Sequence, residues 1–222
     1  MSSSDSVQEK TFLLLRGKII DMELAPGTAM SVYELSEKLS VSRTPVREAF
    51  IRLASESLVS ILPQRRTLVS KIDFSRVRQE RFLRVALELA AVPEFLKNLD
   101  AAALGRMRAV LKLQRDAVRQ GDAVGMLRHD DAFHAIVFEV AGQMLSWGII
   151  EKMSGHYRRV RLMMVRDGEE AEEVIGEHEA LIDAFSAGDG ALAIERTEAH
   201  LRKIILQESR LRNSYPDFFE PS

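Results

Sequence analysis

The 222-residue chain contains no cysteine. This absence excludes a disulfide framework, a thiolate zinc site, an iron–sulfur cluster and a cysteine nucleophile, because each of these needs a cysteine sulfur. A metal ion that binds this protein must therefore be held by histidine and carboxylate side chains.

Long hydrophobic runs are also missing, and none approaches the roughly 20 residues that a membrane-spanning helix needs. The first ten residues, MSSSDSVQEK, have neither the basic nor the apolar region of a secretory signal. We therefore expect a cytoplasmic protein with no membrane partner. Hydrophobic residues make up 46% of the chain. This content is enough for one large or two modest hydrophobic cores, so we do not expect an intrinsically disordered protein.

Glycine is absent from residues 28–104, and the chain has no nucleophile elbow or glycine-rich phosphate loop. Such loops use glycine for positive φ angles and for close approach of the backbone to a ligand. Their absence argues against the common classes of hydrolase and nucleotide-binding enzyme.

The net charge of −2 would by itself argue against nucleic acid as a partner, but the average hides a division. Residues 1–72 carry ten Lys and Arg against eight Asp and Glu, and within them residues 39–71 carry six against two. Residues 73–222 carry 21 against 25. The pattern predicts a small basic domain followed by a larger acidic one.

The expected fold class is mostly α, with an N-terminal winged helix-turn-helix followed by an all-helical bundle of about six helices. Beyond residue 74, apolar residues recur with a helical period, and only Pro93 interrupts the chain before its C-terminal end region. The bundle helices are expected over about 75–97, 100–120, 122–140, 143–165, 171–187 and 190–212, with Asp100, Asp122 and Asp189 as N-caps. The expected domains are 1–72 and 73–213, with a tail over 214–222.

The first 70 residues have a different pattern from the rest. An amphipathic helix is expected over about 7–23, and Ser31 to Glu34 has the spacing of a capping box that begins a short helix ending at Leu39. Another helix begins at Ser42-Arg-Thr-Pro45, since proline is tolerated in a first turn. Two short strands, 58–62 and 67–70, flank a turn. Three helices and a hairpin predict a winged helix-turn-helix.

In such a unit, the N-terminal residues of the second helix of the turn motif face base edges in the major groove. Arg43 and Arg47 lie four residues apart, so both guanidinium groups can face one groove, where their fork matches guanine. The expected DNA-binding residues are Ser42, Arg43, Thr44 and Arg47 in the helix, and Gln64, Arg65 and Arg66 at the hairpin tip. On spacing alone, a solvated basic face on an ordinary small helical domain remains an alternative.

The residues from Leu39 to Phe50, LSVSRTPVREAF, closely resemble the DNA-binding domain of GntR-family bacterial transcription regulators, and the resemblance extends over residues 11–70. Three positions depart from the family pattern. Ser57 and Arg66 stand where glycine is common, and Tyr33 stands where some members have arginine. The resemblance implies a regulator that binds double-stranded DNA.

Four polar residues lie on otherwise apolar faces of three expected helices: Asp130, His134, His178 and His200. Burying such groups is costly unless they satisfy one another, and a divalent cation would do this. For any single one, a hydrogen-bonded core residue is the alternative. The remaining histidines, His129 and His156, are expected at the surface or behind the ligands.

Residues 76–212 resemble the FCD ligand-binding domain of the FadR subfamily, through Arg84-x-x-Leu87-Glu88, Asp130-x-x-Phe133-His134, Glu177-His178, Gly188-Asp189 and His200. The resemblance implies that Asp130, His134, His178 and His200 bind a divalent ion, with zinc, nickel, manganese and iron all acceptable to such ligands. It also implies a small carboxylate or hydroxy-acid effector.

Two arginines are candidates for contacting that effector. Arg84 is placed by its motif, and the alternative for it is an i,i+4 pair with Glu88. Arg159 lies in a segment that resembles part of the pocket helix in some members, and its alternative is a solvated helix face.

The function expected from all this is transcriptional regulation, as a repressor, by a homodimer on a near-palindromic operator, under the control of the metal-bound acid. Two alternatives remain open: a helical metal-dependent hydrolase, and a regulator with a purely structural metal and no effector.

Overall fold

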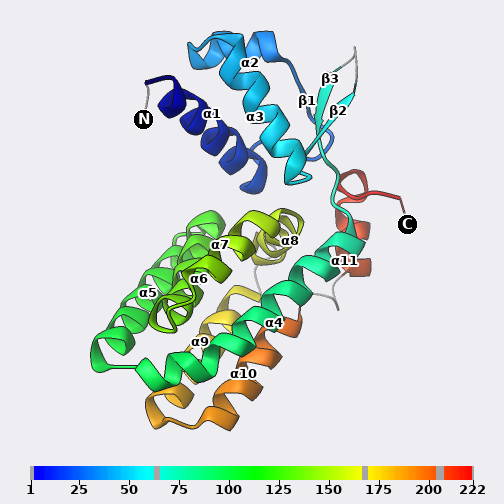
Figure 1. Ribbon diagram of the computed structural model, residues 1–222. Helices are drawn as coiled ribbons and strands as arrows, with labels where there is room; N and C mark the ends of the chain where they lie inside the picture. Colours follow the sequence, from blue (N-terminus) through cyan, green and yellow to red (C-terminus); the bar gives the residue numbers. More distant parts are fainter. Residues whose placement is uncertain (1–2, 63–65, 167–169, 204–207, 222) are drawn as a thin grey trace. The chain divides into compact units, whose positions relative to one another are not determined.

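A computed structural model describes residues 3–62, 66–166, 170–203 and 208–221. The chain forms two compact units (Figure 1). The first contains Met1–Phe74 together with Arg210–Ser222, and the second contains Ser75–Ser209.

The first unit is a winged helix-turn-helix, as predicted. Its elements are α1 (Ser3–Ile20), β1 (Ala29–Met30), α2 (Val32–Leu39), α3 (Arg43–Ser55), β2 (Val59–Leu62) and β3 (Arg66–Val69). The strands form an antiparallel sheet in the order β1-β3-β2, in which Ile61 faces Thr67. Strand β1 was not predicted, because two residues are too few to show an alternating pattern.

The local signals in this unit act as the sequence indicated. The Ser31 hydroxyl accepts a hydrogen bond from the Glu34 backbone N–H at 3.4 Å and so caps α2. Helices α1 and α3 pack their apolar faces together, and Ile19, Val46 and Leu53 are fully buried between them. This packing leaves the opposite face of α3 exposed.

The C-terminal residues were expected to be a tail, but they fold against the first unit. After α11 (Glu208–Ser214) and a 3-10 turn, the Ile72 N–H donates to the Phe218 carbonyl at 2.8 Å, and the Glu220 N–H donates to the Ile72 carbonyl at 3.0 Å. The Phe74 and Phe219 rings stack at 5.0 Å. A pairing between positions so far apart in the chain leaves no local signal in the sequence.

The second unit is all-helical in its described residues. Its helices are α4 (Phe74–Asn98), α5 (Ala101–Arg119), α6 (Ala123–Val140), α7 (Met144–Met153), α8 (Gly155–Arg166), α9 (Glu170–Ala187) and α10 (Gly190–Arg202). All three predicted aspartate N-caps are confirmed, since Asp100, Asp122 and Asp189 each accept a backbone N–H three residues ahead. The core includes Phe95, Phe133, Phe138 and Phe185.

The prediction of one helix over 143–165 was wrong, because the chain breaks at Ser154 into α7 and α8. The Glu80 carboxylate from α4 accepts the backbone N–H groups of His156 and Tyr157, at 2.9 and 2.8 Å, and so begins a new helix. Within the predicted helix over 190–212, α10 ends at Arg202 and α11 begins at Glu208, and residues 204–207 lie outside the described part. No helix in the described residues is long and apolar enough to cross a membrane.

Candidate metal centre and DNA-binding face

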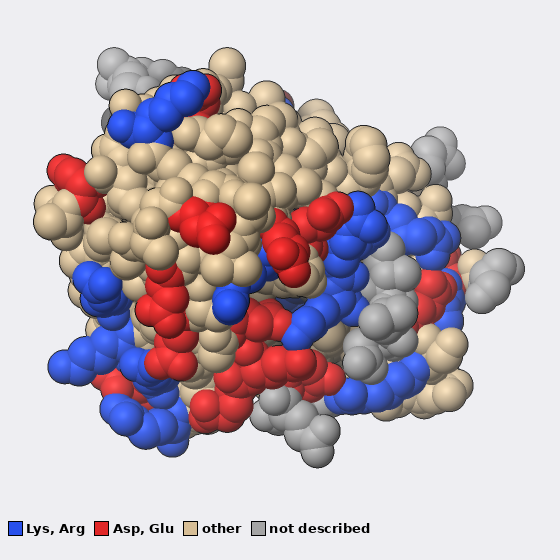
Figure 2. Space-filling model, turned by 90° about the horizontal axis from the view of Figure 1, so that it is seen from below, with Lys and Arg blue, Asp and Glu red and all other residues tan. Residues whose placement is uncertain are grey.

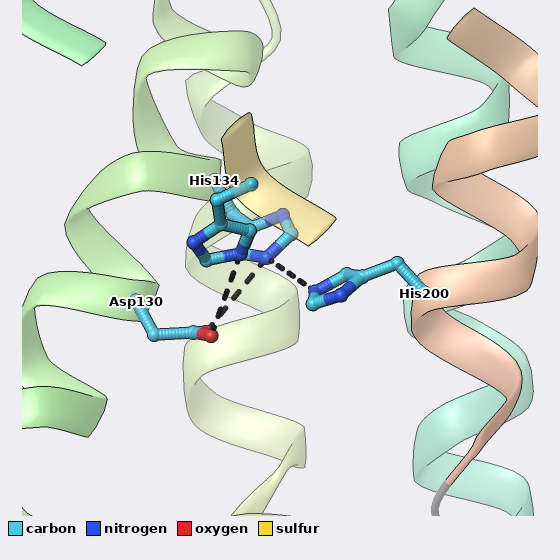
Figure 3. A group of neighbouring side chains, drawn as sticks. Asp130, His134 and His200 are labelled. Carbon is cyan, nitrogen blue, oxygen red and sulfur yellow. Dashed lines mark hydrogen bonds and ion pairs between the residues drawn. The ribbon is translucent and has the colours of Figure 1, made fainter. Parts of the chain in front are cut away.

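The four predicted ligands come together inside the second unit. Asp130 and His134 lie one turn apart on α6, His178 comes from α9 and His200 from α10, and Figure 3 shows the labelled side chains pointing toward one another. One ligand atom from each residue lies within 4.8 Å of the others. Ligands bound at about 2.0–2.2 Å to one ion are at most about 4.4 Å apart, so only small side-chain adjustments separate this arrangement from a coordination shell.

The Nδ1 atom of each of the three histidines lies beside an oxygen acceptor from another residue. His134 Nδ1 contacts a Glu88 carboxylate oxygen, His178 Nδ1 lies 2.8 Å from Gln114 Oε1, and His200 Nδ1 lies 2.7 Å from Glu177 Oε2. These three oxygens are acceptors only, so each Nδ1 carries the proton. The Nε2 lone pairs of the three rings therefore face the centre, as they do in proteins that bind a metal through supported imidazoles.

The Nε2 lone pairs of these histidines have few hydrogen-bond donors near them among the described residues. His134 Nε2 and His200 Nε2 are 3.2 Å apart, so two acceptors face each other unless a proton or a cation lies between them. His178 Nε2 is fully buried and has no hydrogen-bond partner among the described residues. A buried acceptor without a donor is costly, and a divalent cation would satisfy all three nitrogens at once. The donor set fits a divalent metal.

The charge states of the residues also fit. Burial lowers the pKa of His178 well below its usual value, and the neighbouring His200 lowers it further, so the ring is neutral. Burial would raise the pKa of Asp130, but Arg161 and the histidines together keep it well below its usual range. Burial would likewise raise the pKa of Glu88, but the opposite effect, mainly of His134, is larger, and the pKa is lowered to about 2. The centre thus offers an anionic carboxylate at Asp130 and a neutral imidazole at His178.

A cavity of about 300 Å³ adjoins the ligands, with Asp130 and His200 in its wall. Much of the rest of the wall is apolar, with Met126, Leu127, Met164, Val165, Val174 and Leu201. Two arginines, Arg84 and Arg161, also line it, and both guanidinium groups lie 5.6–5.8 Å from the centre of the Tyr157 ring. The cavity therefore combines an apolar surface with charges of both signs, because Glu170, Glu173, Glu177 and Lys203 line it as well.

Arg84 combines the two roles considered from the sequence. Its Nε lies 3.4 Å from Glu88 Oε2, which is the i,i+4 pair, while its Nη2 is buried and makes no hydrogen bond within the described ranges. The nearest carboxylate oxygen to Nη2 in an ion pair is Asp130 Oδ2, at 3.7 Å. Arg84 thus brings a buried donor to the cavity wall.

Arg159 does not line this cavity, contrary to the sequence-based expectation. It is not on a solvated helix face either, because it is 0% exposed and its Nε donates to the Gly155 carbonyl at 3.2 Å. Burial lowers its pKa to about 10, against the opposing effect of Glu80. Arg161, two residues further along α8, lies in the cavity wall where Arg159 was expected.

Arg161 joins α8 to α6. One of its terminal nitrogens pairs with Asp130 and the other lies 3.0 Å from Asp131 Oδ1, while Arg158 also pairs with Asp131. The sequence analysis did not identify this network. It also missed Gln114, although a glutamine in the buried stripe of α5 was a usable signal. His156 was expected at the surface or behind the ligands, but it is buried at the start of α8, and its backbone N–H is bound by Glu80.

The charged residues of the cavity wall also pair with one another. Lys203 lies 2.6 Å from Glu173 and also pairs with Glu177, the residue that holds His200. Acidic and basic side chains also lie next to one another across the lower half of the view in Figure 2. Such a mixture gives local ion pairs rather than the broad positive field that DNA requires.

The candidate DNA-binding face lies on α3 in the first unit. Ser42, Arg43, Thr44 and Arg47 are all exposed, and the Ser42 hydroxyl does not cap the helix. Pro45, Val46 and Ala49 are buried on the opposite side. The helix therefore presents its first turn to solvent with its hydrogen-bonding groups available.

Two arginines of this face differ in their surroundings. The Arg43 guanidinium lies 5.2 Å from the centre of the Tyr33 ring, whereas Arg47 has no hydrogen bond or ion pair with any residue in the ranges described above. Arg66 is exposed at the start of β3. Gln64 and Arg65 lie outside the described residues. Ser57, which stands where the family has glycine, adopts the left-handed conformation with φ +58°.

A winged helix-turn-helix joined to a helical unit with a buried ligand cluster defines a two-domain DNA-binding regulator. Residues 7–69 match the description "Bacterial regulatory proteins, gntR family", and residues 81–203 match the FCD domain. The chain therefore belongs to the GntR family of transcriptional regulators and carries an FCD domain.

Similar proteins have the same architecture. An uncharacterised HTH-type transcriptional regulator of Streptomyces ambofaciens is 34% identical over 94% of this chain and 87% of that protein. The HTH-type transcriptional repressor RspR of Escherichia coli K12 is 30% identical over 99% of this chain and 96% of its own. The structure of E. coli McbR/YncC matches with a TM-score of 0.80 and 22% identity, covering 97% of this chain and all of that one. These relatives are regulators rather than enzymes, which sets aside the hydrolase considered from the sequence.

Proposed function

We propose that this regulator is a repressor whose affinity for its operator is controlled by a small organic acid bound at a divalent metal in the FCD domain. The observation that carries the proposal is the convergence of three imidazole lone pairs and one carboxylate beside a cavity that contains buried arginines.

Asp130, His134, His178 and His200 would hold the metal, which would supply a Lewis acid able to accept an effector carboxylate. Glu88, Gln114 and Glu177 keep the three rings in the orientation and tautomer that this requires. Zinc, nickel, manganese and iron all remain candidates for such a donor set.

The effector would be a small carboxylate or hydroxy-acid. Arg84 Nη2 is buried and makes no hydrogen bond with the residues that the structure describes, so we expect it to be available to a second oxygen of the acid, and Arg161 offers a further charge. The volume of about 300 Å³ and the apolar wall favour a compact molecule with a short carbon chain. Arg84 also favours this reading over a purely structural metal, which would need no arginine at the cavity.

The first unit would contact DNA through α3. Arg43 and Arg47 would reach guanine edges, Ser42 and Thr44 would donate to phosphates, and the wing residues Gln64, Arg65 and Arg66 would contact the backbone or the minor groove. A homodimer would place two such helices in successive major grooves of a near-palindromic operator. The name of RspR supports repression rather than activation.

The link between the two units would begin at Arg161. An effector carboxylate competes with Asp130 for its guanidinium, while the contact with Asp131 keeps Arg161 attached to α6. If Arg161 exchanged Asp130 for the effector, α8 would shift relative to α6. In the dimer, this shift would change the spacing of the DNA-binding units.

A thermal-shift screen of small carboxylic acids tests the proposal, after elemental analysis has identified the ion. An acid at 100 times its Kd should stabilise the metal-loaded protein by about 2.7 kcal/mol, which is roughly 5–10 °C for a chain of this size. The metal-stripped protein and the corresponding neutral amides are the matched controls. Equal melting temperatures with and without every acid would indicate a structural metal and contradict effector control.

A further inference from the structure

Tyr157 is a buried residue of the cavity wall with a polar end. Its side chain is 2% exposed, and it lies in the first turn of α8. Its backbone N–H donates to the Glu80 carboxylate at 2.8 Å. Glu80 lies one turn before Arg84 on α4, so one helix holds both the backbone of Tyr157 and the arginine beside its ring.

The hydroxyl group of Tyr157 makes no hydrogen bond with any residue that the structure describes. A buried tyrosine usually has a partner for its O–H, because burying a polar group without one is costly. The neighbouring Arg84 Nη2 is a buried donor that likewise has no acceptor among the described residues. Two polar groups of one cavity wall therefore stay unsatisfied and do not satisfy each other. A ligand that carries acceptors would satisfy both.

The two arginines beside Tyr157 determine what its hydroxyl can offer. The guanidinium groups of Arg84 and Arg161 lie 5.8 and 5.6 Å from the centre of the ring. Hydroxyl dipoles orient in the field of the protein, so the oxygen turns toward these positive charges and the hydrogen turns away from them. The hydroxyl therefore presents a hydrogen-bond donor to a molecule in the cavity.

We propose that Tyr157 determines the specificity of the effector site, with its hydroxyl donating to an oxygen on the carbon next to the effector carboxylate. The inference rests on the effector control proposed above. It adds the residue that separates 2-oxo and 2-hydroxy acids from plain carboxylic acids. A site built to bind a polar group of its ligand rejects analogues that lack the group, because its own buried atoms then stay unpaired.

In the alternative interpretation, Tyr157 only fills the space between the two arginines, and its hydroxyl contacts water. Phenylalanine at this position keeps the ring and its packing and takes away the oxygen alone. The two interpretations therefore differ in one measurable respect, which is whether the loss of affinity depends on a second oxygen in the ligand.

Two four-carbon acids provide the probes. Butyrate has no polar group beyond its carboxylate, and 2-oxobutyrate adds one acceptor next to it. Isothermal titration calorimetry on the metal-loaded protein gives a Kd for each. We expect the wild type to bind 2-oxobutyrate at least about 10-fold more tightly than butyrate.

The Tyr157→Phe variant isolates the contact. The ratio of the two Kd values should fall at least about 5-fold, because 2-oxobutyrate loses a hydrogen bond and butyrate does not. Any other preference for the 2-oxo group is the same in both proteins and cancels when the ratios are compared. Met164→Leu, at another buried residue of the same wall, is the matched control and should keep the wild-type ratio. Unchanged metal content in both variants shows that the ligand cluster is intact.

The outcomes separate this inference from the proposed function. A Tyr157→Phe variant that keeps the wild-type ratio, even with both acids weakened, would overturn the role of the hydroxyl and leave effector control standing. A wild-type protein that binds 2-oxobutyrate no more tightly than butyrate would do the same, as would an equal loss of the ratio in Met164→Leu. If no acid of the thermal-shift screen binds the metal-loaded protein, the proposed function fails and the inference fails with it.

Discussion

In the candidate metal centre, the two ring nitrogens of each histidine have different surroundings. The Nε2 atoms of His134, His178 and His200 face one another, while the Nδ1 atoms face fixed oxygen acceptors. That these four residues come together could be predicted from the sequence, because each interrupts an apolar helix face. Gln114 could not be assigned to His178, because no local pattern connects residues 64 positions apart.

Removing two ligands should remove the metal. The His178→Ala and His200→Ala double variant leaves two of four protein ligands, so we expect it to be purified with no bound ion. Mass-spectrometric elemental analysis measures this, with His129→Ala as the control that keeps its metal. A double variant with full metal content would show that these residues do not form the site.

The supporting glutamine makes a finer prediction. Gln114→Leu keeps the volume of the side chain but takes away the acceptor that fixes the His178 ring, so metal affinity should fall by about 10–100-fold. Competition with a metal-sensitive dye measures this affinity. If Gln114→Leu binds the metal as tightly as the wild type, the orientation of His178 does not depend on this hydrogen bond.

At the scale of helices and strands, the sequence predicted the elements whose signals are local. Capping serine and aspartate residues marked the starts of α2, α5, α6 and α10, and apolar periodicity marked the buried faces. The division between α7 and α8 could not be predicted, because its main cause is a carboxylate that comes from α4. The C-terminal pairing at Ile72 and the placement of Arg161 instead of Arg159 at the cavity likewise depend on tertiary contacts.

The start of α8 should depend on Glu80. Replacing it by leucine leaves the buried N–H groups of His156 and Tyr157 without their acceptor, at a cost of about 1–3 kcal/mol for each unsatisfied group. Urea unfolding followed by circular dichroism should show a free energy of unfolding lower by about 2–6 kcal/mol. Glu198→Leu, at the partly exposed residue that pairs with Arg202, is the control and should change it little. A stable Glu80→Leu variant would mean that the helix begins without this contact.

Helix α3 gives the corresponding prediction for DNA. Arg47 is exposed and unpaired within the described structure, so its replacement by alanine costs no intramolecular contact. Arg47→Ala should weaken specific binding by about 1–3 kcal/mol for each lost base contact while leaving non-specific binding nearly unchanged. Fluorescence anisotropy with operator and scrambled DNA measures both. Unchanged operator affinity would reject α3 as the recognition helix.

For the whole molecule, the basic and acidic segments seen in the sequence contain different candidate sites. The basic segment contains the exposed arginines of α3, and the acidic segment contains the ligand cluster and its cavity. The absence of cysteine, which limited the metal ligands to imidazole and carboxylate, agrees with the cluster that the second unit assembles. The proposed control of DNA binding requires a coupling free energy between effector and DNA, and such couplings are typically about 1–3 kcal/mol.

The most direct test of the central claim is the operator affinity of the metal-loaded protein with and without a stabilising acid found in the thermal-shift screen. We predict that saturating acid changes the Kd for operator DNA by about 5–150-fold. The change should disappear in the metal-stripped protein and in the His178→Ala and His200→Ala double variant. An operator affinity that is the same with and without the bound acid would contradict the account.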